Sequence, residues 1–127
     1  MQANHVVIWI DHREAHVLYF DSSKNQIIKS ISEHTHLHHK ANTIGSGNAP
    51  SDHVFFDQVI ASLVNANEIL IVGPGSAKGE IVKYIATHHN ILSKKIMGVE
   101  TVDHLTDGQV LAYAKKYFLK VDQLRGV

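Results

Sequence analysis

The sequence has 127 residues, with 12 Lys and Arg against 12 Asp and Glu, 11 His and no Cys, and 44% of its residues are hydrophobic. This length and apolar content fit one globular domain, and the lack of cysteine excludes disulfides, thiolate metal sites and cysteine nucleophiles. A formal charge of zero is unusual for a dedicated nucleic-acid-binding domain, so any contact with RNA is expected to be local or assisted by histidine.

Membrane insertion and export are not predicted. No run approaches the roughly 18–20 apolar residues that a membrane span needs. The first residues, MQANHVVIWIDH, lack a basic start, a long apolar stretch and a small-residue cleavage site. We therefore expect a cytoplasmic protein with no membrane partner.

The first third of the chain predicts a three-stranded meander. Residues 5–10 (HVVIWI) form a nearly continuous apolar run, typical of a central strand that is covered on both faces. Residues 14–20 and 26–32 are rich in strand-forming residues, and polar turns at 11–13 and 21–25 separate the three segments. The first two strands are expected to pair antiparallel.

A long loop is predicted at about residues 33–51, EHTHLHHKANTIGSGNAPS. Its Lys, Asn, Thr, Gly, Ser and Pro residues show neither strand alternation nor a helical apolar face. Loops of this length inside compact domains are usually functional or disordered. We expect this loop to be mobile and to make the functional contacts.

The second half of the chain predicts alternating helices and strands. A helix is expected at 52–66 with Ser51 as N-cap, and its inward positions are Val54, Phe55, Val59, Ile60, Leu63 and Val64. Strands are expected at 68–72 and 96–102, and a second helix at 77–88. A last helix is expected from Thr106 to about Lys120, opened by a capping box of Thr106 and Gln109.

This element order, β-β-β-α-β-α-β-α, predicts an α/β fold of ribonuclease H-like order in a single domain over residues 1–127. It implies a mixed five-stranded sheet with helices on its faces and with the first strand beside the fourth. The carboxyl ends of four strands would then share one edge, where ligands bind in open α/β sheets. Asp11, His12, the histidine-rich loop, residues 73–78 and residues 100–104 would gather there.

The histidine cluster of the loop has two interpretations. His34, His36 and His38 would point one way in an extended segment, and neutral imidazoles at this spacing can chelate zinc or another divalent metal. Further ligands could come from three Asp-His pairs, Asp11–His12, Asp52–His53 and Asp103–His104. Alternatively, these histidines are loop residues that contact phosphate or local backbone, since no H-E-x-x-H or comparable motif is present.

The segment Gly73-Pro74-Gly75-Ser76-Ala77-Lys78 lies where a strand meets a helix. Free N–H groups at a helix N-terminus bind anions, and Lys78 would add charge, so phosphate binding by Gly73, Gly75, Ser76 and Lys78 is a candidate function. The Walker spacing is absent, and a tight turn capped by Ser76 would explain the same residues.

Two weaker patterns remain. Asp11, Glu100 and Asp103 could contribute to a two-metal nuclease centre, although turn and capping roles suffice for them. The second half of the chain is modestly basic, and a basic last helix could rest on RNA backbone; its cations are Lys94, Lys95, Lys115, Lys116, Lys120 and Arg125.

Three segments together, HLHHK, GPGSAK and ETVDHLTDGQ, resemble small bacterial proteins described as "translational machinery protein". More remotely, the element order and glycine-containing loop are similar to the middle domain of archaeo-eukaryotic class-one peptide-chain release factors. The resemblance covers about Val6 to Phe118. It implies the same fold and a factor associated with the ribosome, rRNA or tRNA.

In release factors this loop carries Gly-Gly-Gln, which promotes hydrolysis of peptidyl-tRNA. By position, Ser46, Gly47 and Asn48 would be the catalytic candidates here, and only Gly47 is retained. Asn is one methylene shorter than Gln, and Ser restricts backbone angles that Gly allows, so these replacements argue against hydrolysis. If the chain were an enzyme, it would be an ester hydrolase acting on peptidyl-tRNA.

The sequence thus favours a ribosome- or RNA-associated accessory factor of translation with no cofactor. The loop would bind phosphate through His36, His38, His39 and Lys40. One alternative is a metal-binding protein or metal-dependent hydrolase that uses the histidine cluster. Another is a non-catalytic, homo-oligomeric binding module.

Overall fold

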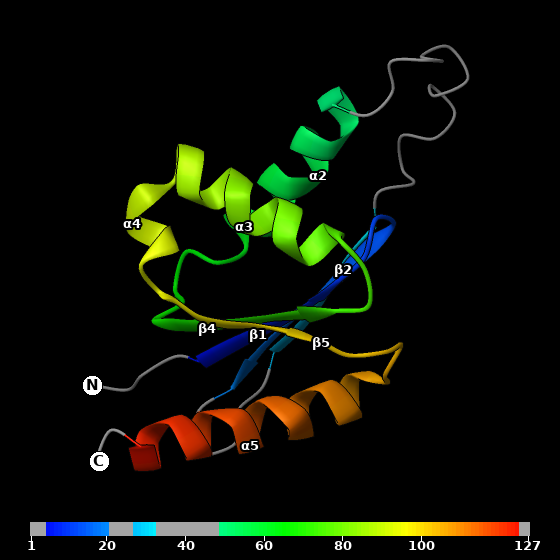
Figure 1. Ribbon diagram of the computed structural model, residues 1–127. Helices are drawn as coiled ribbons and strands as arrows, with labels where there is room; N and C mark the ends of the chain where they lie inside the picture. Colours follow the sequence, from blue (N-terminus) through cyan, green and yellow to red (C-terminus); the bar gives the residue numbers. More distant parts are fainter. Residues whose placement is uncertain (1–4, 21–26, 33–48, 125–127) are drawn as a thin grey trace.

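A computed structural model describes residues 5–20, 27–32 and 49–124 (Figure 1). Its strands form one five-stranded sheet in the order β3-β2-β1-β4-β5. The strands are β1 (His5–Ile10), β2 (Glu14–Phe20), β3 (Ile27–Ser32), β4 (Glu68–Gly73) and β5 (Ile96–Thr101). The helices are α2 (Ala49–Ala61), α3 (Ala77–His88), α4 (Asn90–Ser93) and α5 (Asp107–Leu124).

The pairing of the strands confirms the predicted mixed sheet. β1 pairs antiparallel with β2 and parallel with β4, while β3 is antiparallel to β2 and β5 is parallel to β4. Strands β1, β3, β4 and β5 therefore run in the same direction, and their carboxyl ends share one edge of the sheet. The predicted element order is also confirmed, with the short α4 as an addition.

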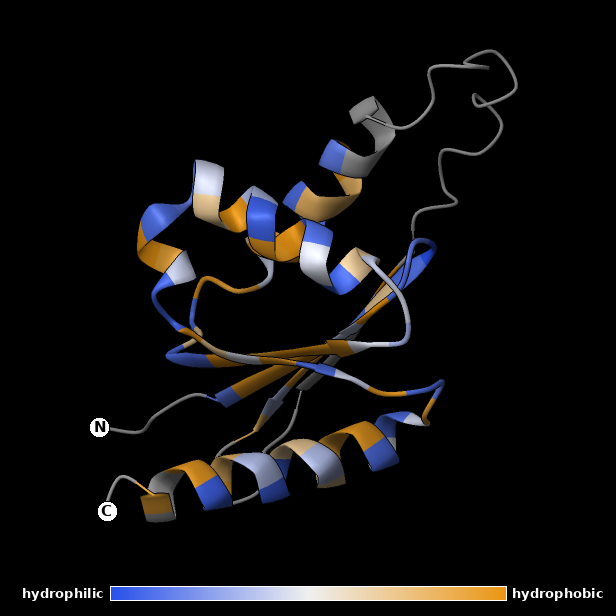
Figure 2. Ribbon diagram, in the orientation of Figure 1, coloured by the Kyte–Doolittle hydropathy of each residue, from blue (hydrophilic) through white to orange (hydrophobic). Residues whose placement is uncertain are grey.

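Strand β1 is central and is buried on both faces. Helices α2, α3 and α4 cover one face of the sheet, and α5 covers the other (Figure 1). Val6, Ile8 and Ile10 belong to the core cluster on the first face, whereas Val7 and Trp9 belong to the cluster beneath α5. Figure 2 shows the sheet as an apolar layer between the helices. A strand that buries both sets of side chains has no polar side, which explains its unbroken apolar run.

Helix α5 begins with the predicted capping box. The amide of Thr106 donates to Gln109 Oε1 over 2.9 Å, and the amide of Gln109 donates to Thr106 Oγ1 over 3.1 Å. These bonds satisfy donors that the first turn leaves without intrahelical partners. Val110, Leu111, Ala114 and Phe118 form the buried stripe. None of the helices that the structure describes combines the length and apolar character that crossing a bilayer requires.

The prediction for α2 is wrong at its start. The helix begins at Ala49, so Ser51 lies inside the first turn and is not the N-cap, and residues 49–51 are helical. Pro50 is compatible with this start, because the N–H groups of a first turn have no intrahelical acceptor.

The prediction for α2 is also wrong at its end and on one face. The helix stops at Ala61, and tight turns follow, in which the amides of Ser62 and Leu63 donate to carbonyls three residues back. The hydroxyl of Ser62 bonds to the Val59 carbonyl over 2.6 Å. Val54 and Val64, predicted to point inward, are exposed by 44% and 78%, and Phe56 is buried instead.

Gly73 lies at the closest approach of β1 and β4. A Cβ atom at this position would lie 2.2 Å from the carbonyl oxygen of Ile10. The carbonyl of Gly73 accepts the amide of Val102 over 3.1 Å, which holds the end of β5 beside it. Any side chain at position 73 would therefore separate the strands at the edge where the candidate residues gather.

We predict that Gly73→Ala lowers the free energy of unfolding by about 1–3 kcal/mol, the usual cost of an atom that a packed core cannot accommodate. Gly79→Ala is the control, because a Cβ at this exposed site in α3 would meet nothing within 4 Å. It should raise stability by roughly 0.5–1 kcal/mol, since Ala favours helix over Gly. Urea unfolding followed by circular dichroism measures both, and equal stabilities would contradict the steric argument.

Candidate functional site

The carboxyl ends of the parallel strands form one edge of the sheet, as predicted. The turn after β1, the turn between β4 and α3, and the connection from β5 to α5 all lie there (Figure 1). The described residues of these segments include two histidines, His12 and His104, and a third, His16, lies near the start of the adjoining strand β2. Each of the three faces a carboxylate.

Asp11 organises the turn after β1. Its Oδ1 accepts the amides of Arg13 and Glu14 over 2.8 and 2.9 Å, and its own amide donates to the Glu14 carbonyl over 3.0 Å. The second oxygen, Oδ2, lies 3.5 Å from Nε2 of His104. Asp11 is therefore a turn-forming residue that also pairs with the connection after β5, as short Asp side chains commonly do.

The helix N-terminus of α3 already holds a carboxylate. Glu80 accepts the hydroxyl of Ser76 over 3.1 Å, and its two oxygens lie 3.2 and 3.3 Å from Nε2 of His12. Ser76 occupies the N-cap position but makes no side-chain cap bond, so the predicted capping role of its hydroxyl is wrong. Lys78 donates to the carbonyl of Gly75 over 2.6 Å. A phosphate bound at this turn would compete with Glu80 for the positive end of the helix.

His16 lies between two carboxylates. Its Nδ1 is 2.8 Å from Asp107 Oδ1 and its Nε2 is 3.3 Å from Glu14 Oε1. Neutral imidazole has one N–H donor, so the neutral ring can donate to only one of these two groups. The contact with Asp107 joins β2 to the first residue of α5.

Trp9 is 4% exposed and lies beneath the side chains of the same edge. Its ring lies edge-on to His16 at 5.9 Å and tilted against His104 at 5.0 Å. The indole N–H donates to the carbonyl of Asp103 over 3.0 Å. This bond fixes the β5–α5 connection over the end of β1.

The edge consists of separate histidine–carboxylate pairs rather than one reactive centre. Within residues 5–20, 27–32 and 49–124, no group of three or more His, Cys, Asp or Glu side chains is arranged to hold a metal ion. Asp11, Glu100 and Asp103, considered for a two-metal centre, form no such group among these residues, and the Asp11 carboxylate accepts the amides of its own turn.

A second cluster of rings lies between α2 and α3. Tyr84 is flanked by His88, with ring centroids 4.4 Å apart, and by His53 at 5.0 Å, while Phe56 lies behind it at 5.6 Å. The Tyr84 hydroxyl donates to Asp57 Oδ1 over 2.7 Å. That bond is the main reason that the pKa of Tyr84 is raised, with burial and the Asp57 charge adding to it.

The loop candidates lie outside the described residues. These are the metal-ligand candidates His34, His36 and His38, the further phosphate-binding candidates His39 and Lys40, and the catalytic candidates Ser46, Gly47 and Asn48. Their roles stay predictions. Of the other proposed ligands, the structure brings Asp11 and His104 together but places His53 in the ring cluster.

The sequence interpretation missed His16, Glu80 and Tyr84. For His16 and Tyr84 the sequence carried a weak signal. His16 interrupts the apolar alternation of its strand, on the face that it shares with Trp9, and Tyr84 and His88 are four residues apart on one helix face. Glu80 one turn into α3 carried no signal that it would reach His12, a contact that depends on the strand order.

Comparisons with known proteins show likeness in fold. No protein-family model matches the sequence, and no curated protein sequence matches it significantly. The Pelota protein of Thermoplasma acidophilum superposes with a TM-score of 0.63 at 20% identity, over 88% of this chain and 32% of that one. The archaeal translation termination factor aRF1 superposes with a TM-score of 0.53 at 13% identity, over 97% of this chain and 41% of that one.

A third structure is Dom34 of S. cerevisiae, a translation termination-like factor involved in RNA quality control pathways. It matches with a TM-score of 0.51 at 15% identity, over 77% of this chain and 29% of that one. The chain thus spans about a third of the length of the structures it resembles. At these identities the likeness establishes the mixed five-stranded α/β fold, as predicted.

We predict that Asp57→Asn lowers the pKa of Tyr84 towards its usual range, because the substitution removes the charge that opposes ionisation. The folded-state pKa of Tyr84 lies above the unfolded value near 10. The stability that its protonated hydroxyl contributes is therefore present below about pH 10 and lost as the pH rises through the folded-state pKa.

Tyrosinate absorbance during alkaline titration measures this shift. Tyr84→Phe is needed to isolate the signal, because burial also raises the pKa values of Tyr19 and Tyr113. An identical Tyr84 titration in the wild type and Asp57→Asn would contradict the assigned influence of the Asp57 carboxylate on the pKa of Tyr84.

Proposed function

We propose that this protein is an accessory factor of translation that binds ribosomal RNA or tRNA. The observation that carries the proposal is the likeness in fold to Pelota over 88% of the chain and to the translation termination factor aRF1 over 97%. The resemblance of the sequence to release-factor middle domains points the same way and rests on different evidence.

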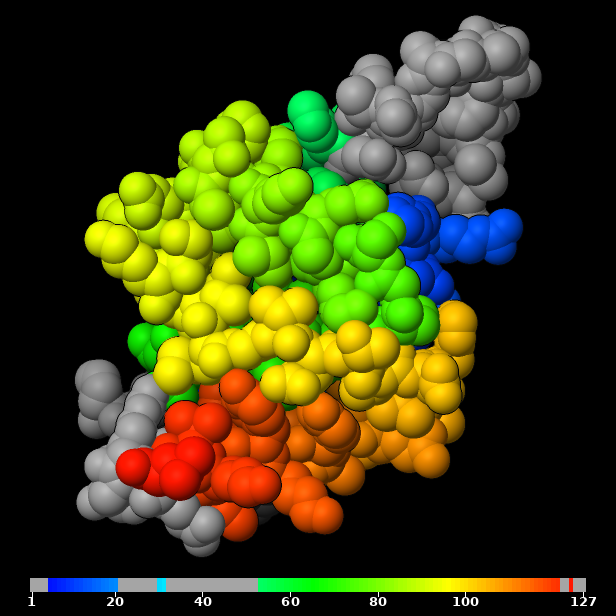
Figure 3. All heavy atoms as spheres, in the orientation of Figure 1, coloured from blue at the N-terminus to red at the C-terminus, as the bar shows by residue number. Residues whose placement is uncertain are grey.

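One side of α5 combines exposed lysines with two half-buried tyrosines, Tyr113 and Tyr117, which pack against the core cluster beneath the helix. A shallow groove there, of about 490 Å³, is lined by Tyr113, Lys116, Tyr117, Leu119 and Lys120. Lys115, Lys116 and Lys120 are exposed. Figure 3 shows the atoms of α5, in orange and red, at the surface of the molecule. Ammonium groups bind phosphates and tyrosine rings stack on bases, so this alternation suits single-stranded or looped RNA.

The face of α5 is a better phosphate surface than the carboxyl edge of the sheet. At the edge, Glu80 and Asp11 each face a histidine, and Lys78 bonds to a carbonyl. On α5 the exposed lysines come from consecutive turns, and no ion pair involving them occurs in the described part of the chain. A lysine without an ion-pair partner attracts a phosphate more strongly than one whose charge is already paired.

The histidine-rich loop would provide the second RNA-binding surface in this proposal. His36, His38, His39 and Lys40 would add phosphate contacts, with Gly45 and Gly47 allowing close backbone approach. Hydrolysis of peptidyl-tRNA is not part of the proposed activity, because Ser46 and Asn48 replace the Gly and Gln of the release-factor loop.

The first test is sedimentation of the tagged protein from gently lysed cells through a sucrose gradient at low and raised salt. We expect co-migration with ribosomal particles at low salt and release as salt rises, because phosphate contacts weaken with ionic strength. The triple variant His38→Ala, His39→Ala, Lys40→Ala should show weaker association. A protein that stays at the top of the gradient at both salt concentrations would contradict the proposal.

A second test isolates the α5 face. Lys116→Gln with Lys120→Gln should weaken binding to purified ribosomes or tRNA by several-fold to roughly ten-fold, and reduce the slope of log K against log salt by about 1.5. Lys83→Gln is the control, because Lys83 is an exposed lysine of α3 on the opposite layer. Equal losses in both variants would indicate a general charge effect and would overturn the assignment to α5.

A further inference from the structure

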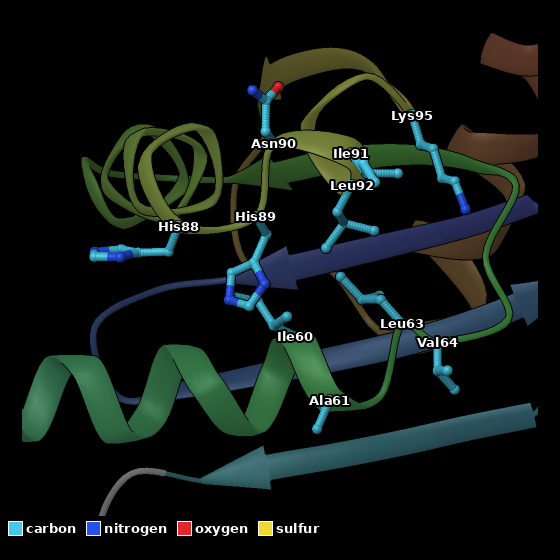
Figure 4. Close-up of a pocket in the computed structure, with 10 residues that line it drawn as sticks. All are labelled: Ile60, Ala61, Leu63, Val64, His88, His89, Asn90, Ile91, Leu92 and Lys95. Atoms are coloured by element: carbon cyan, nitrogen blue, oxygen red, sulfur yellow. The ribbon is translucent and has the colours of Figure 1, made fainter.

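A groove with no role in the proposed function lies between the end of α2 and the turn from α3 to α4. Its volume is about 650 Å³, in the range of ligand-binding clefts. Figure 4 shows two walls, one from the end of α2 and the turn after it, and the other from the α3–α4 region. The lining residues are Ile60, Ala61, Leu63, Val64, His88, His89, Asn90, Ile91, Leu92 and Lys95.

The base of the groove is formed by residues that pack in or against the hydrophobic core. Leu63 is 1% exposed and belongs to the core cluster, against which Ile60 and Leu92 also pack. Lys95 donates to the Ala66 carbonyl over 3.1 Å, which ties the segment before β5 to the turn after α2. His88 packs on Tyr84 in the adjoining ring cluster. These contacts fix both walls, so the groove is preformed.

Two aliphatic side chains lie on its rim in contact with solvent. Val64 and Ile91 come from opposite walls and are each 78% exposed. Exposed aliphatic groups beside an apolar groove typically mark a surface that another molecule covers. The two walls thus present matching apolar positions to one occupant.

The charged groups at the groove are lysines. Lys95 lines it, the exposed Lys94 adjoins Lys95 in the chain, and the described lining includes no carboxylate. A partner with carboxylates would meet complementary charge along this rim. A second copy docked by the same face would instead bring lysines against lysines.

We propose that this groove binds a peptide segment of a partner protein that carries aliphatic side chains flanked by Asp or Glu. Aliphatic side chains fit six of the ten lining residues, and the carboxylates fit the cationic rim. RNA fits less well, because the walls offer mainly aliphatic surface. The inference does not depend on the proposed role in translation, since the groove and α5 lie on opposite faces of the sheet.

Selection from a phage-displayed library of random peptides, about twelve residues long, against the immobilised full-length protein tests the proposal. We expect enriched sequences that combine Leu, Ile, Val or Phe with Asp or Glu. Synthetic versions should bind the wild type, and Val64→Ser with Ile91→Ser should weaken them by about ten-fold, because two apolar contacts with the peptide are lost. Lys94→Gln should weaken acidic peptides but not their amide-substituted analogues.

Leu124→Ser is the control, because Leu124 is 82% exposed at the end of α5, away from the groove. Val64 and Ile91 are so exposed that their replacement should leave the fold intact, which circular dichroism verifies. The proposal is overturned by enrichment of basic peptides, by no enrichment, or by equal weakening in the control. Groove-dependent dimerisation in light scattering, or groove-dependent binding of oligouridylate without peptide binding, would overturn it as well.

Discussion

The parallel pairing of β1 with β4 is the contact on which the rest of the structure depends. Both strands are buried on two faces, and their backbones come so close at the carboxyl end that position 73 accommodates only glycine. The same glycine carbonyl accepts the Val102 amide and so sets where β5 ends. The carboxyl edge, with its turns after β1 and β4 and its connection to α5, is positioned by this one close approach.

The pairing of β1 with β4 also explains why acidic side chains at the carboxyl edge of the sheet lie beside histidines. Residues far apart in the chain meet at the edge, and there acidic side chains find partners: Asp11 with His104, Glu80 with His12, and Asp107 with His16. The contacts join β1, β2, α3 and α5 to one another. Partly exposed pairs of this kind contribute little stability individually, but they use up the charges that a ligand would need. The lysines of α5 have no such partner in the described ion pairs and keep their charge available.

The sequence predicted the elements that depend on local signals or on burial from both sides. The apolar run of residues 5–10 correctly indicated a central strand, and Thr106 with Gln109 correctly placed the start of α5. The prediction failed at the end of α2. Val64 fits a helical apolar spacing, but the helix ends at Ala61, and local turns follow. A tertiary contact lies at the same place, because the Tyr19 hydroxyl of β2 donates to the Ser62 carbonyl, and the spacing of apolar residues does not reveal it.

The candidate site was likewise predicted in part: its location followed from the sequence, but its side-chain contacts did not. The strand order correctly brought Asp11, the turn at residues 73–78 and His104 to one edge. The partner of each charged group could not be derived, because pairs such as His12 with Glu80 join residues 68 positions apart in the chain. Spacing in the sequence identifies which groups are present, whereas their availability for a ligand depends on which neighbours the fold supplies.

The two surfaces proposed to bind partners lie on opposite sides of the sheet. Lysines and tyrosines of α5 cover one layer, and the apolar groove with its cationic rim belongs to the α2–α4 layer. The buried strands between them separate the two surfaces physically, so an RNA on α5 would not obstruct a peptide in the groove. Substitutions at Lys116 and at Ile91 should therefore act additively if both surfaces are used, because distant sites without shared contacts couple weakly. If both proposals hold, the domain would bind a nucleic acid on one face of its sheet and a protein segment on the other.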